Sequence, residues 1–243
     1  MIGPVTLYGS SRAGVRAIKT ITYETTMANF LIADDHPLFR DALTTTLKKG
    51  FPNDRIFTSD SIATTKELIE AEGEPDLLLL DLNMPGSDGF FGLIHLRECY
   101  AAMPVVVISA MEDPLVIQRA LAYGASGFIP KSCPAEQIIE GITAVMEGDC
   151  WVPGQLKVEL DRLPAEEKDF SDRVSALTDQ QFKVLMHLTE GRLNKQIAYD
   201  LSISEATVKA HITAIFRKLG VQNRTQAVIA ASKLKLPEST GTF

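Results

Sequence analysis

A long apolar run is the first feature that the sequence lacks. No stretch of its 243 residues approaches the ~20 consecutive apolar residues that a membrane span requires. Residues 1–26 contain few apolar runs and do not resemble a secretion signal. Because neither a span nor a secretion signal is recognised, the sequence predicts a cytoplasmic protein.

Cysteine is also scarce. The three cysteines, Cys99, Cys133 and Cys150, are an odd number and contain no C-x-x-C pair. This spacing argues against a disulfide framework and against a metal site made of cysteines. We expect three reduced thiols that are buried as small hydrophobic side chains.

Positive charge is sparse in the body of the chain and gathers near its end. The net charge is −7, but residues 27–150 carry −11 and residues 171–243 carry +4. Residues 1–26 carry +2 and residues 151–170 carry −2. An acidic body with a basic C-terminal part indicates two domains with different partners, and phosphate backbones are candidates for the basic part. Solvated helices are often basic as well, so charge alone does not decide between these interpretations.

Residues 27–150 alternate between strand-like and helix-like patterns. Short apolar runs occur at 30–33, 55–58, 76–80, 105–108 and 127–129, and amphipathic stretches follow them at 37–49, 61–72, 88–100, 114–123 and 134–147. The central runs are apolar on both faces, as a parallel sheet covered by helices requires. The pattern predicts an α/β doubly wound domain with a five-stranded parallel sheet.

The remaining segments differ from this body. Residues 1–26 show little periodicity and are expected to form a flexible extension. Residues 151–174 contain two prolines and a charged stretch, which predicts a linker with a single helical turn. Residues 175–236 carry only helical patterns, so we expect a small all-α domain there and a tail over residues 237–243. The expected helices of that domain span 178–190, 194–201, 205–219 and 224–235.

Polar side chains stand at the ends of four of the five predicted strands. Asp34 and Asp35 end the first, Asp81 the third, Ser109 the fourth and Lys131 the fifth. In a parallel α/β sheet these ends share one edge, and three carboxylates there repel each other unless a cation lies between them. Oxygen ligands favour Mg²⁺. A lysine and a hydroxyl beside them suit a phosphoryl group, so one aspartate could be a nucleophile in phosphoryl transfer.

Each of these side chains also has an ordinary structural interpretation. A single aspartate at a strand end is usually a turn or capping residue, a lone Ser109 could cap the next helix, and a lone Lys131 could be a solvated charge. Their occurrence at the corresponding end of four strands favours function. His36 is expected to start the first helix and receives no catalytic role.

The motifs that carry these side chains are Ile32-Ala-Asp-Asp-His-Pro37, Leu79-Leu-Asp-Leu-Asn-Met-Pro-Gly86, Val107-Ile-Ser-Ala110 and Gly124-Ala-Ser-Gly-Phe-Ile-Pro-Lys131. With them, residues 30–148 resemble the flavodoxin-like receiver domain of two-component response regulators. The resemblance implies that Asp81 accepts the phosphoryl group and that Mg²⁺ is held by Asp34, Asp35, Asp81 and the Asn83 carbonyl. It also implies that Ser109 is the switch hydroxyl, Phe128 the switch aromatic and Lys131 the lysine that binds phosphate.

Three of these residues keep a second interpretation. Phe128 could be an ordinary core side chain that does not rotate on phosphorylation. The Asn83 amide, two positions after Asp81, could contact the attacking water and set the lifetime of the phosphate, with Met111 flanking the same entrance. Loop packing is the alternative for both Asn83 and Met111.

The C-terminal helical patterns have the outline of a helix-turn-helix. Thr178 to Gln181 is a helix-start signal, Gly191 is a candidate C-cap, and residues 194–201 and 205–219 give a short helix, a turn and a longer helix. On the longer helix one side is apolar, carrying Val208, Ile212, Ile215 and Leu219. The opposite side carries Lys209, Ala210, Thr213 and Arg217, which suits a DNA major groove. A merely solvated amphipathic helix is the alternative.

Residues 175–235 are similar to the LuxR-type DNA-binding domain of the NarL/FixJ class. The motifs include Asn194-Lys-Gln-Ile-Ala198, Thr207-Val-Lys-Ala-His211 and Lys218-Leu-Gly220. The resemblance implies DNA contacts by Lys195, Thr207, Lys209, Ala210, Thr213 and Arg217. Gln181 stands where a glutamate is usual, which puts a familiar internal salt bridge in doubt.

The last predicted helix, 224–235, is expected to expose a small apolar stripe that includes Ala227, Val228 and Ala231. In the family the corresponding helix forms the dimer contact on DNA. Packing of these residues against their own domain is the alternative, and both can hold for different residues.

Together these patterns predict a transcriptional regulator whose binding to promoter DNA is controlled by phosphorylation from a sensor histidine kinase, with a homodimer as the phosphorylated or DNA-bound form. The protein is not expected to be an enzyme beyond its own phosphoryl transfer and dephosphorylation. One rival is a phosphorylation-independent DNA-binding protein with a vestigial receiver. Another is a phosphohydrolase with an aspartate nucleophile. Such an enzyme would normally have a second acidic residue where this chain has Asn83, and it would not explain residues 175–235.

Overall fold

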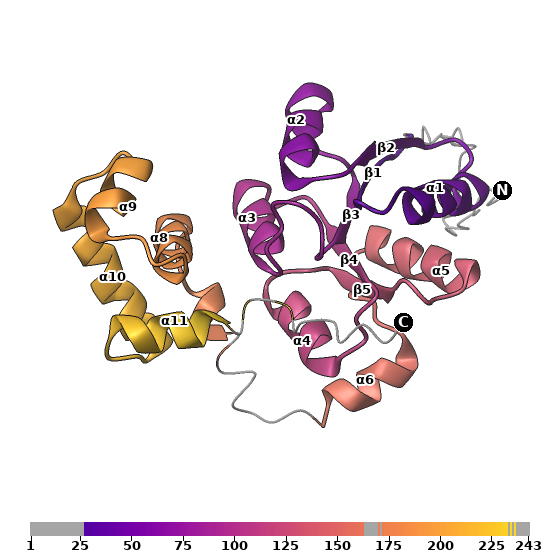
Figure 1. The fold of residues 1–243 in the computed structure, drawn as a ribbon. Coiled ribbons are helices and arrows are strands. Elements are labelled where there is room, and N and C mark those ends of the chain that lie inside the picture. Colours follow the sequence, from indigo (N-terminus) through magenta and orange to yellow (C-terminus); the bar gives the residue numbers. More distant parts are fainter. Residues whose placement is uncertain (1–26, 163–169, 171, 233, 235, 237–243) are drawn as a thin grey trace, which may run out of the picture.

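A computed structural model describes residues 27–162, 170, 172–232, 234 and 236. The chain forms two domains, an α/β domain and a helical domain (Figure 1). The flexible extension expected for residues 1–26 and the tail expected for residues 237–243 lie outside the described residues. Within the described part, no helix combines the length and the apolar character that crossing a membrane would demand.

The first domain contains a five-stranded parallel sheet in the order β2-β1-β3-β4-β5. The fold class predicted from the alternating patterns is therefore confirmed. Its strands are β1 (Asn29–Ala33), β2 (Arg55–Ser59), β3 (Leu77–Asp81), β4 (Val105–Ser109) and β5 (Gly127–Pro130). Its helices are α1 (Pro37–Gly50), α2 (Ile62–Glu72), α3 (Phe91–Cys99), α4 (Pro114–Ala122), α5 (Ala135–Met146) and α6 (Gly154–Leu160).

Helices cover both faces of the sheet because alternate strand residues point to opposite sides. Phe30 and Ile32 of β1 face the core beneath α1 and α5. Leu31 and Ala33 face the core on the side of α2, α3 and α4. Almost every residue of β3 and β4 is buried, which explains why their sequences are continuous apolar runs rather than alternating ones.

Helix α3 begins later than its amphipathic pattern suggests. The pattern predicted a helix over residues 88–100, whereas α3 begins at Phe91. Asp88 and Gly89 have φ values of 44° and 76°, and Gly86 has 81°. These left-handed conformations are incompatible with a right-handed helix and keep the segment after β3 as a compact loop.

The segment predicted as a linker contains more structure than a single helical turn. Trp151 is buried, and its carbonyl accepts a hydrogen bond of 2.9 Å from the amide of Phe128 in β5. Leu156 of α6 is buried as well, and α6 packs on α4. The chain therefore stays on the α/β domain as far as α6 before it reaches the helical domain.

The expected burial of the cysteines is wrong. Cys99 and Cys150 are exposed, and Cys133 is half-buried. All three are free thiols. Cys99 is the last residue of the short helix α3, where the helix end leaves the sheet and little covers a side chain.

The second domain contains α8 (Asp179–Thr189), α9 (Asn194–Asp200), α10 (Glu205–Leu219) and α11 (Arg224–Ser232), and the described residues 172–175 before α8 are helical as well. Thr178 caps α8 in a capping box with Gln181, as its sequence predicted. Ser204 caps α10, and Gly220 ends it in the left-handed conformation with φ of 70°. Helices α8, α10 and α11 pack around a common core.

The two domains meet where α8 lies against α3 (Figure 1). The rings of Phe91 in α3 and Phe182 in α8 lie 5.1 Å apart between centroids. The hydroxyl of Ser175 donates a 2.9 Å hydrogen bond to the carbonyl of Ala122 at the end of α4. Both domains thus contribute to one continuous apolar cluster.

A group of ionisable side chains borders this contact. Glu98 and His95 of α3 face Asp179 of α8, whose carboxylate binds Lys183 at 2.6 Å. Burial, followed by the hydrogen bond to Asp179, raises the pKa of Glu98 to about 7. A carboxyl group must keep a proton to donate to a neighbouring carboxylate, so Glu98 is the protonated partner and Asp179 the ionised one.

We expect this pair to make the domain contact sensitive to pH. The pKa of Glu98 is raised in the folded chain, so its stabilising effect is complete below the usual value of 4.5 and is lost as the pH rises through about 7. The contribution of Glu98 to the thermal midpoint should therefore decrease as the pH is raised from 5.5 to 8. In Glu98→Gln, whose amide remains a donor at every pH, the decrease at this position should be smaller.

Differential scanning calorimetry at both pH values measures this difference. Glu67→Gln provides the matched control, because Glu67 lies exposed on α2, away from the domain contact. Equal pH dependence in the wild type and in Glu98→Gln would show that the pair does not contribute.

Candidate functional site

The predicted polar side chains converge at the carboxyl edge of the sheet. Asp81 and Ser109 are the last residues of β3 and β4, and Asp34 follows β1 directly. Lys131 follows β5, and its amide donates a 2.8 Å hydrogen bond to the carbonyl of Ser109. Parallel strands place these ends side by side, so four separate segments build one site.

Lys131 connects the two most deeply buried carboxylates. Its Nζ lies 2.8 Å from Oδ2 of Asp81 and 2.7 Å from Oδ2 of Asp34. Both aspartate side chains are only 2% exposed. The ammonium group also lies 4.8 Å from the centre of the Phe39 ring. Lys131 is therefore held at the place where a bound anion would meet the carboxylate of Asp81.

The surroundings of Asp81 have opposing effects on its charge. Burial raises the pKa of the Asp81 carboxyl, and the charge of Asp34 adds to that rise. The hydrogen bond from Lys131, its positive charge and the amide of Asn83 at 3.1 Å oppose it. Burial has the largest effect, so the net result is a raised pKa of Asp81.

His36 belongs to this cluster, although the sequence analysis gave it no role. It precedes the first residue of α1, as expected for a helix-start residue. Its Nδ1 lies 2.9 Å from Oδ1 of Asp35, 3.1 Å from Oδ1 of Asp34 and 3.7 Å from Oδ2 of Asp81. The signal in the sequence was its position directly after the aspartate pair.

The donor set fits a divalent cation. Carboxylate oxygens of Asp34, Asp35 and Asp81 and the ring nitrogen of His36 lie within 4.8 Å of one another. Three carboxylates against the single ammonium of Lys131 leave an excess of negative charge. An ion that prefers oxygen ligands, such as Mg²⁺, would neutralise that excess.

Ser109 and Phe128 lie on adjacent strands beneath the site. The hydroxyl of Ser109 is buried and accepts a 3.1 Å hydrogen bond from the amide of Met111. Phe128 is fully buried in the core. Rotation of this ring on phosphorylation remains a prediction.

The site opens into a cavity. Asp81, Asn83, Ser109, Met111 and Lys131 line it, so Asn83 and Met111 share one cavity with Asp81. Their roles at an entrance for attacking water remain predictions. His36, Leu38, Phe39, Ala110 and Leu236 complete its wall.

The helix-turn-helix presents a second candidate surface. The residues expected to contact DNA all lie exposed on α9 and α10, namely Lys195, Thr207, Lys209, Ala210, Thr213 and Arg217. On the opposite side of α10, Val208, Ile215 and Leu219 are buried, and Ile212 is partly buried. The division of α10 into a core face and an outer face is therefore confirmed.

Two hydroxyls on this surface already have partners within their own helix. The Thr207 hydroxyl lies 2.8 Å from that of the cap residue Ser204. The hydroxyl of Thr213 donates to the carbonyl of Lys209 at 3.0 Å. Lys209 and Arg217 thus carry most of the available hydrogen-bond donors of α10.

The substitution at Gln181 changes a contact without removing it. The Nζ of Lys218 donates to Oε1 of Gln181 at 2.7 Å and also contacts the carbonyl of Ala176. A neutral amide thus takes the place of the carboxylate of a salt bridge. The link between α8 and α10 is retained.

The predicted exposure of the small apolar stripe on α11 is wrong for two of its three residues. Ala227 and Ala231 are buried, and α11 packs on α8 of its own domain. Val228 is partly buried against the same core. The large exposed apolar side chain of α11 is Ile229, 64% of which is accessible. Packing within the domain, the alternative named above, accounts for Ala227 and Ala231.

Comparison with known proteins matches both domains. Residues 30–143 match the response regulator receiver domain, and residues 175–231 match the bacterial regulatory proteins of the luxR family. The chain is 42% identical over 213 residues to the glycerol metabolism activator of Pseudomonas putida, covering 86% of this chain and 96% of that one. It is 31% identical over 215 residues to the transcriptional regulatory protein LnrK of Bacillus subtilis, covering 84% of this chain and 96% of that one.

The fold is also found among solved structures. RcsB from Salmonella enterica serovar Typhimurium, bound to a promoter in the presence of the phosphomimetic BeF3−, matches with a TM-score of 0.52. The two chains are 20% identical, and the match covers 86% of this chain and 99% of that one. At this identity the likeness concerns the fold alone.

We expect Asp35→Ala to weaken Mg²⁺ binding by tenfold or more. Removing one unit charge about 4 Å from a divalent ion costs on the order of 2 kcal/mol even at the dielectric constant of water. Isothermal titration calorimetry with MgCl2 measures the affinity. Asp41→Ala is the matched control, because it removes the same charge from an exposed position on α1. Unchanged affinity in Asp35→Ala would remove Asp35 from the cation site.

Proposed function

Because the chain belongs to the response regulators that join a receiver domain to a LuxR-type DNA-binding domain, we propose that phosphorylation of Asp81 controls how its helix-turn-helix binds promoter DNA. The observation that carries this proposal is the contact of Lys131 with the buried carboxylates of Asp81 and Asp34. That arrangement combines a nucleophile, a phosphate-binding cation and an acidic cation site within one cavity.

The phosphoryl donor in this proposal is a phosphohistidine on a sensor kinase. A carboxylate oxygen of Asp81 attacks the phosphorus, and the bond between phosphorus and the histidine nitrogen breaks. The bonding electrons return to the imidazole, and an acyl phosphate forms on Asp81. A bound Mg²⁺, held by Asp34, Asp35, Asp81 and the carbonyl of Asn83, would supply positive charge opposite the incoming phosphoryl oxygens.

The neighbouring residues then hold the product. Lys131 is placed to pair with one phosphoryl oxygen, exchanging its contact with the Asp81 carboxylate for a contact with the phosphate. Ser109 reaches a second oxygen once its hydroxyl turns away from the amide of Met111. Phe128, buried on the adjacent strand β5, is the aromatic side chain proposed to follow this movement.

Two other functions fit the chain less well. A phosphohydrolase with an aspartate nucleophile would normally have a second acidic residue two positions after that nucleophile. This chain has the amide of Asn83 at that position. A vestigial receiver would not need the complete set of acidic and basic groups, which is intact here. The helix-turn-helix domain supports a regulator over a hydrolase.

The proposed partners follow from the two domains. A sensor histidine kinase would donate to Asp81, and double-stranded promoter DNA would contact α10 through Lys209 and Arg217, with Lys195 on α9. The protein would act in the cytoplasm as a homodimer when phosphorylated or bound to DNA. The name of the Pseudomonas putida relative supports activation rather than repression of transcription.

We expect Asp81→Asn to abolish acid-labile phosphorylation, because an amide is a poor nucleophile and forms no acyl phosphate. Phos-tag electrophoresis after incubation with acetyl phosphate and Mg²⁺ measures the labelled fraction. Asp54→Asn is the control, because Asp54 lies outside the cavity before β2. Undiminished labelling of Asp81→Asn would place the acceptor on another residue.

We expect two lysines of the helix-turn-helix to contribute differently to DNA binding. Lys195→Ala should weaken binding to specific and random DNA alike and lower the salt slope by about one counterion, because a contact with the backbone carries no sequence information. Lys209→Ala should cost on the order of 1–3 kcal/mol only on the true operator, if it contacts a base edge.

Fluorescence anisotropy on operator and scrambled duplexes at several salt concentrations distinguishes the two contributions. Equal losses that depend only on salt would assign Lys209 to the backbone. Binding that is unchanged in both variants would contradict the proposed docking face.

A further inference from the structure

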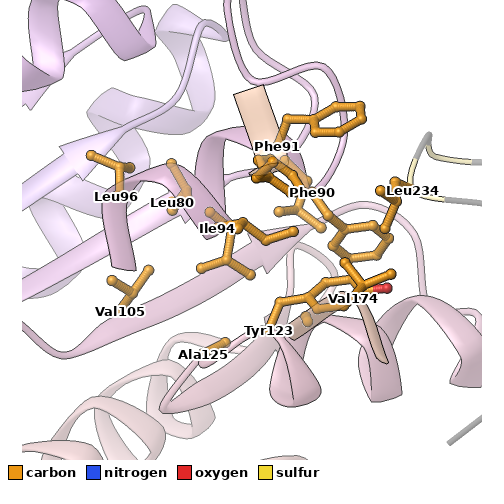
Figure 2. Packing of buried hydrophobic residues seen from close by; sticks show 14 of the residues in the cluster. Leu80, Phe90, Phe91, Ile94, Leu96, Val105, Tyr123, Ala125, Val174 and Leu234 are labelled. Carbon is orange, nitrogen blue, oxygen red and sulfur yellow. The ribbon is translucent and has the colours of Figure 1, made fainter. Parts of the chain in front are cut away.

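Leu234, a described residue beyond α11, packs against the receiver domain. Leu234 is fully buried, although it lies beyond the last helix of the DNA-binding domain. Figure 2 shows its side chain beside Phe90, Tyr123 and Val174. Phe90 and Tyr123 belong to the receiver, whereas Val174 precedes α8. A residue near the C-terminal end of the chain therefore completes an apolar cluster between the two domains.

A backbone hydrogen bond fixes this contact. The carbonyl of Leu234 accepts a 3.2 Å hydrogen bond from the amide of Phe90. Phe90 immediately precedes α3, and no side chain caps that helix. Amide groups at the start of a helix have no acceptor within the helix, so Leu234 supplies one from the other domain.

Leu236 continues the same path into the phosphorylation site. It is half-buried and lines the cavity that also contains Asp81, Ser109 and Lys131. Met111, another residue that lines this cavity, packs on the same core cluster as Leu236. An apolar side chain from the far end of the chain thus forms part of the wall of a charged cavity.

The two contacts lie at opposite ends of one loop. The loop begins after Asp81 and ends at Phe90, and it is held in a tight conformation by the hydrogen bond from the Ser87 hydroxyl to the carbonyl of Gly89. Leu234 touches the end of this loop, and Leu236 lines the cavity that Asp81 and Asn83, at the beginning of the loop, also line. A rearrangement of the loop around a phosphorylated Asp81 would therefore disturb both contacts.

We infer that Leu234 and Leu236 form a C-terminal strap that narrows the phosphorylation cavity in the unphosphorylated protein and is displaced when Asp81 is phosphorylated. The inference rests on the proposed phosphorylation of Asp81. The strap follows α11 directly, so its displacement loosens the attachment of the DNA-binding domain to the receiver. Coupling between two sites is reciprocal, so a strap that opposes phosphorylation must itself be released by phosphorylation.

Leu236→Ala tests the strap with little effect on the core, because Leu236 is only half-buried and Leu234 is retained. Removing most of a half-buried leucine side chain should raise the rate of phosphorylation by acetyl phosphate by roughly three- to tenfold. The rate of dephosphorylation should stay unchanged, since the strap is already displaced in the phosphorylated form. Ile229→Ala is the matched control, because it shortens an exposed side chain of α11 outside the cavity.

Hydrogen exchange provides a second readout in the unmodified chain. The amide of Phe90 should exchange more rapidly in the phosphorylated protein than in the unphosphorylated one, because it loses the carbonyl of Leu234. Equal phosphorylation rates in Leu236→Ala and Ile229→Ala, or unchanged protection of Phe90 on phosphorylation, would overturn the strap. Failure of the wild-type protein to become labelled at all would instead contradict the phosphorylation of Asp81.

Discussion

The structure depends on the close approach of several carboxylate groups at one edge of the parallel sheet. Asp34 and Asp81 are buried side by side, and like charges in such a place are tolerated only if opposite charge is supplied. Lys131 supplies part of it from β5, the edge strand on that side of the sheet, at 2.7 and 2.8 Å. The requirement for opposite charge ties β1, β3 and β5 together. It also leaves the cavity ready for a cation and for a phosphoryl group, whose binding would redistribute the contacts of Lys131.

The sequence was sufficient to predict the sheet and the residues at its edge. Strand runs such as those of β3 and β4 are apolar throughout, and the polar residue that ends each run marks the carboxyl edge. The start of α3 was predicted too early, because the amphipathic pattern was extended over Asp88 and Gly89, although the Pro-Gly and Asp-Gly pairs of residues 85–89 are local turn signals. The structure at Trp151 and α6 was missed for a different reason. Its stability comes from contacts with β5 and α4, which no local pattern reveals.

Proximity across the fold explains the other differences. His36 lies near three aspartates only because α1 begins directly above the edge of the sheet, so its position next to Asp35 in the sequence was a weak signal. Ala227 and Ala231 form a stripe that would be exposed on an isolated helix, and α8 covers it. The resemblance to the LuxR-type domain identified the helices correctly. It did not specify which of their small apolar residues the domain uses for its own core.

The contact between the domains limits how phosphorylation can control DNA binding. Phe182 and Asp179 of α8 face α3, whereas α10 lies on the side of the helical domain away from the receiver (Figure 1). Lys209 and Arg217 of α10 are exposed. The receiver therefore does not regulate by covering the residues expected to read DNA in this arrangement. Control must act on the position of the helical domain relative to the receiver or to a second copy. The groups that fix this position are the rings of Phe91 and Phe182, the ionisable cluster around Glu98, and the contact of Leu234 with Phe90. Of these, the contact at Phe90 lies on the loop that begins at Asp81, so a change at this proposed acceptor would reach the DNA-binding domain through it by the shortest covalent path.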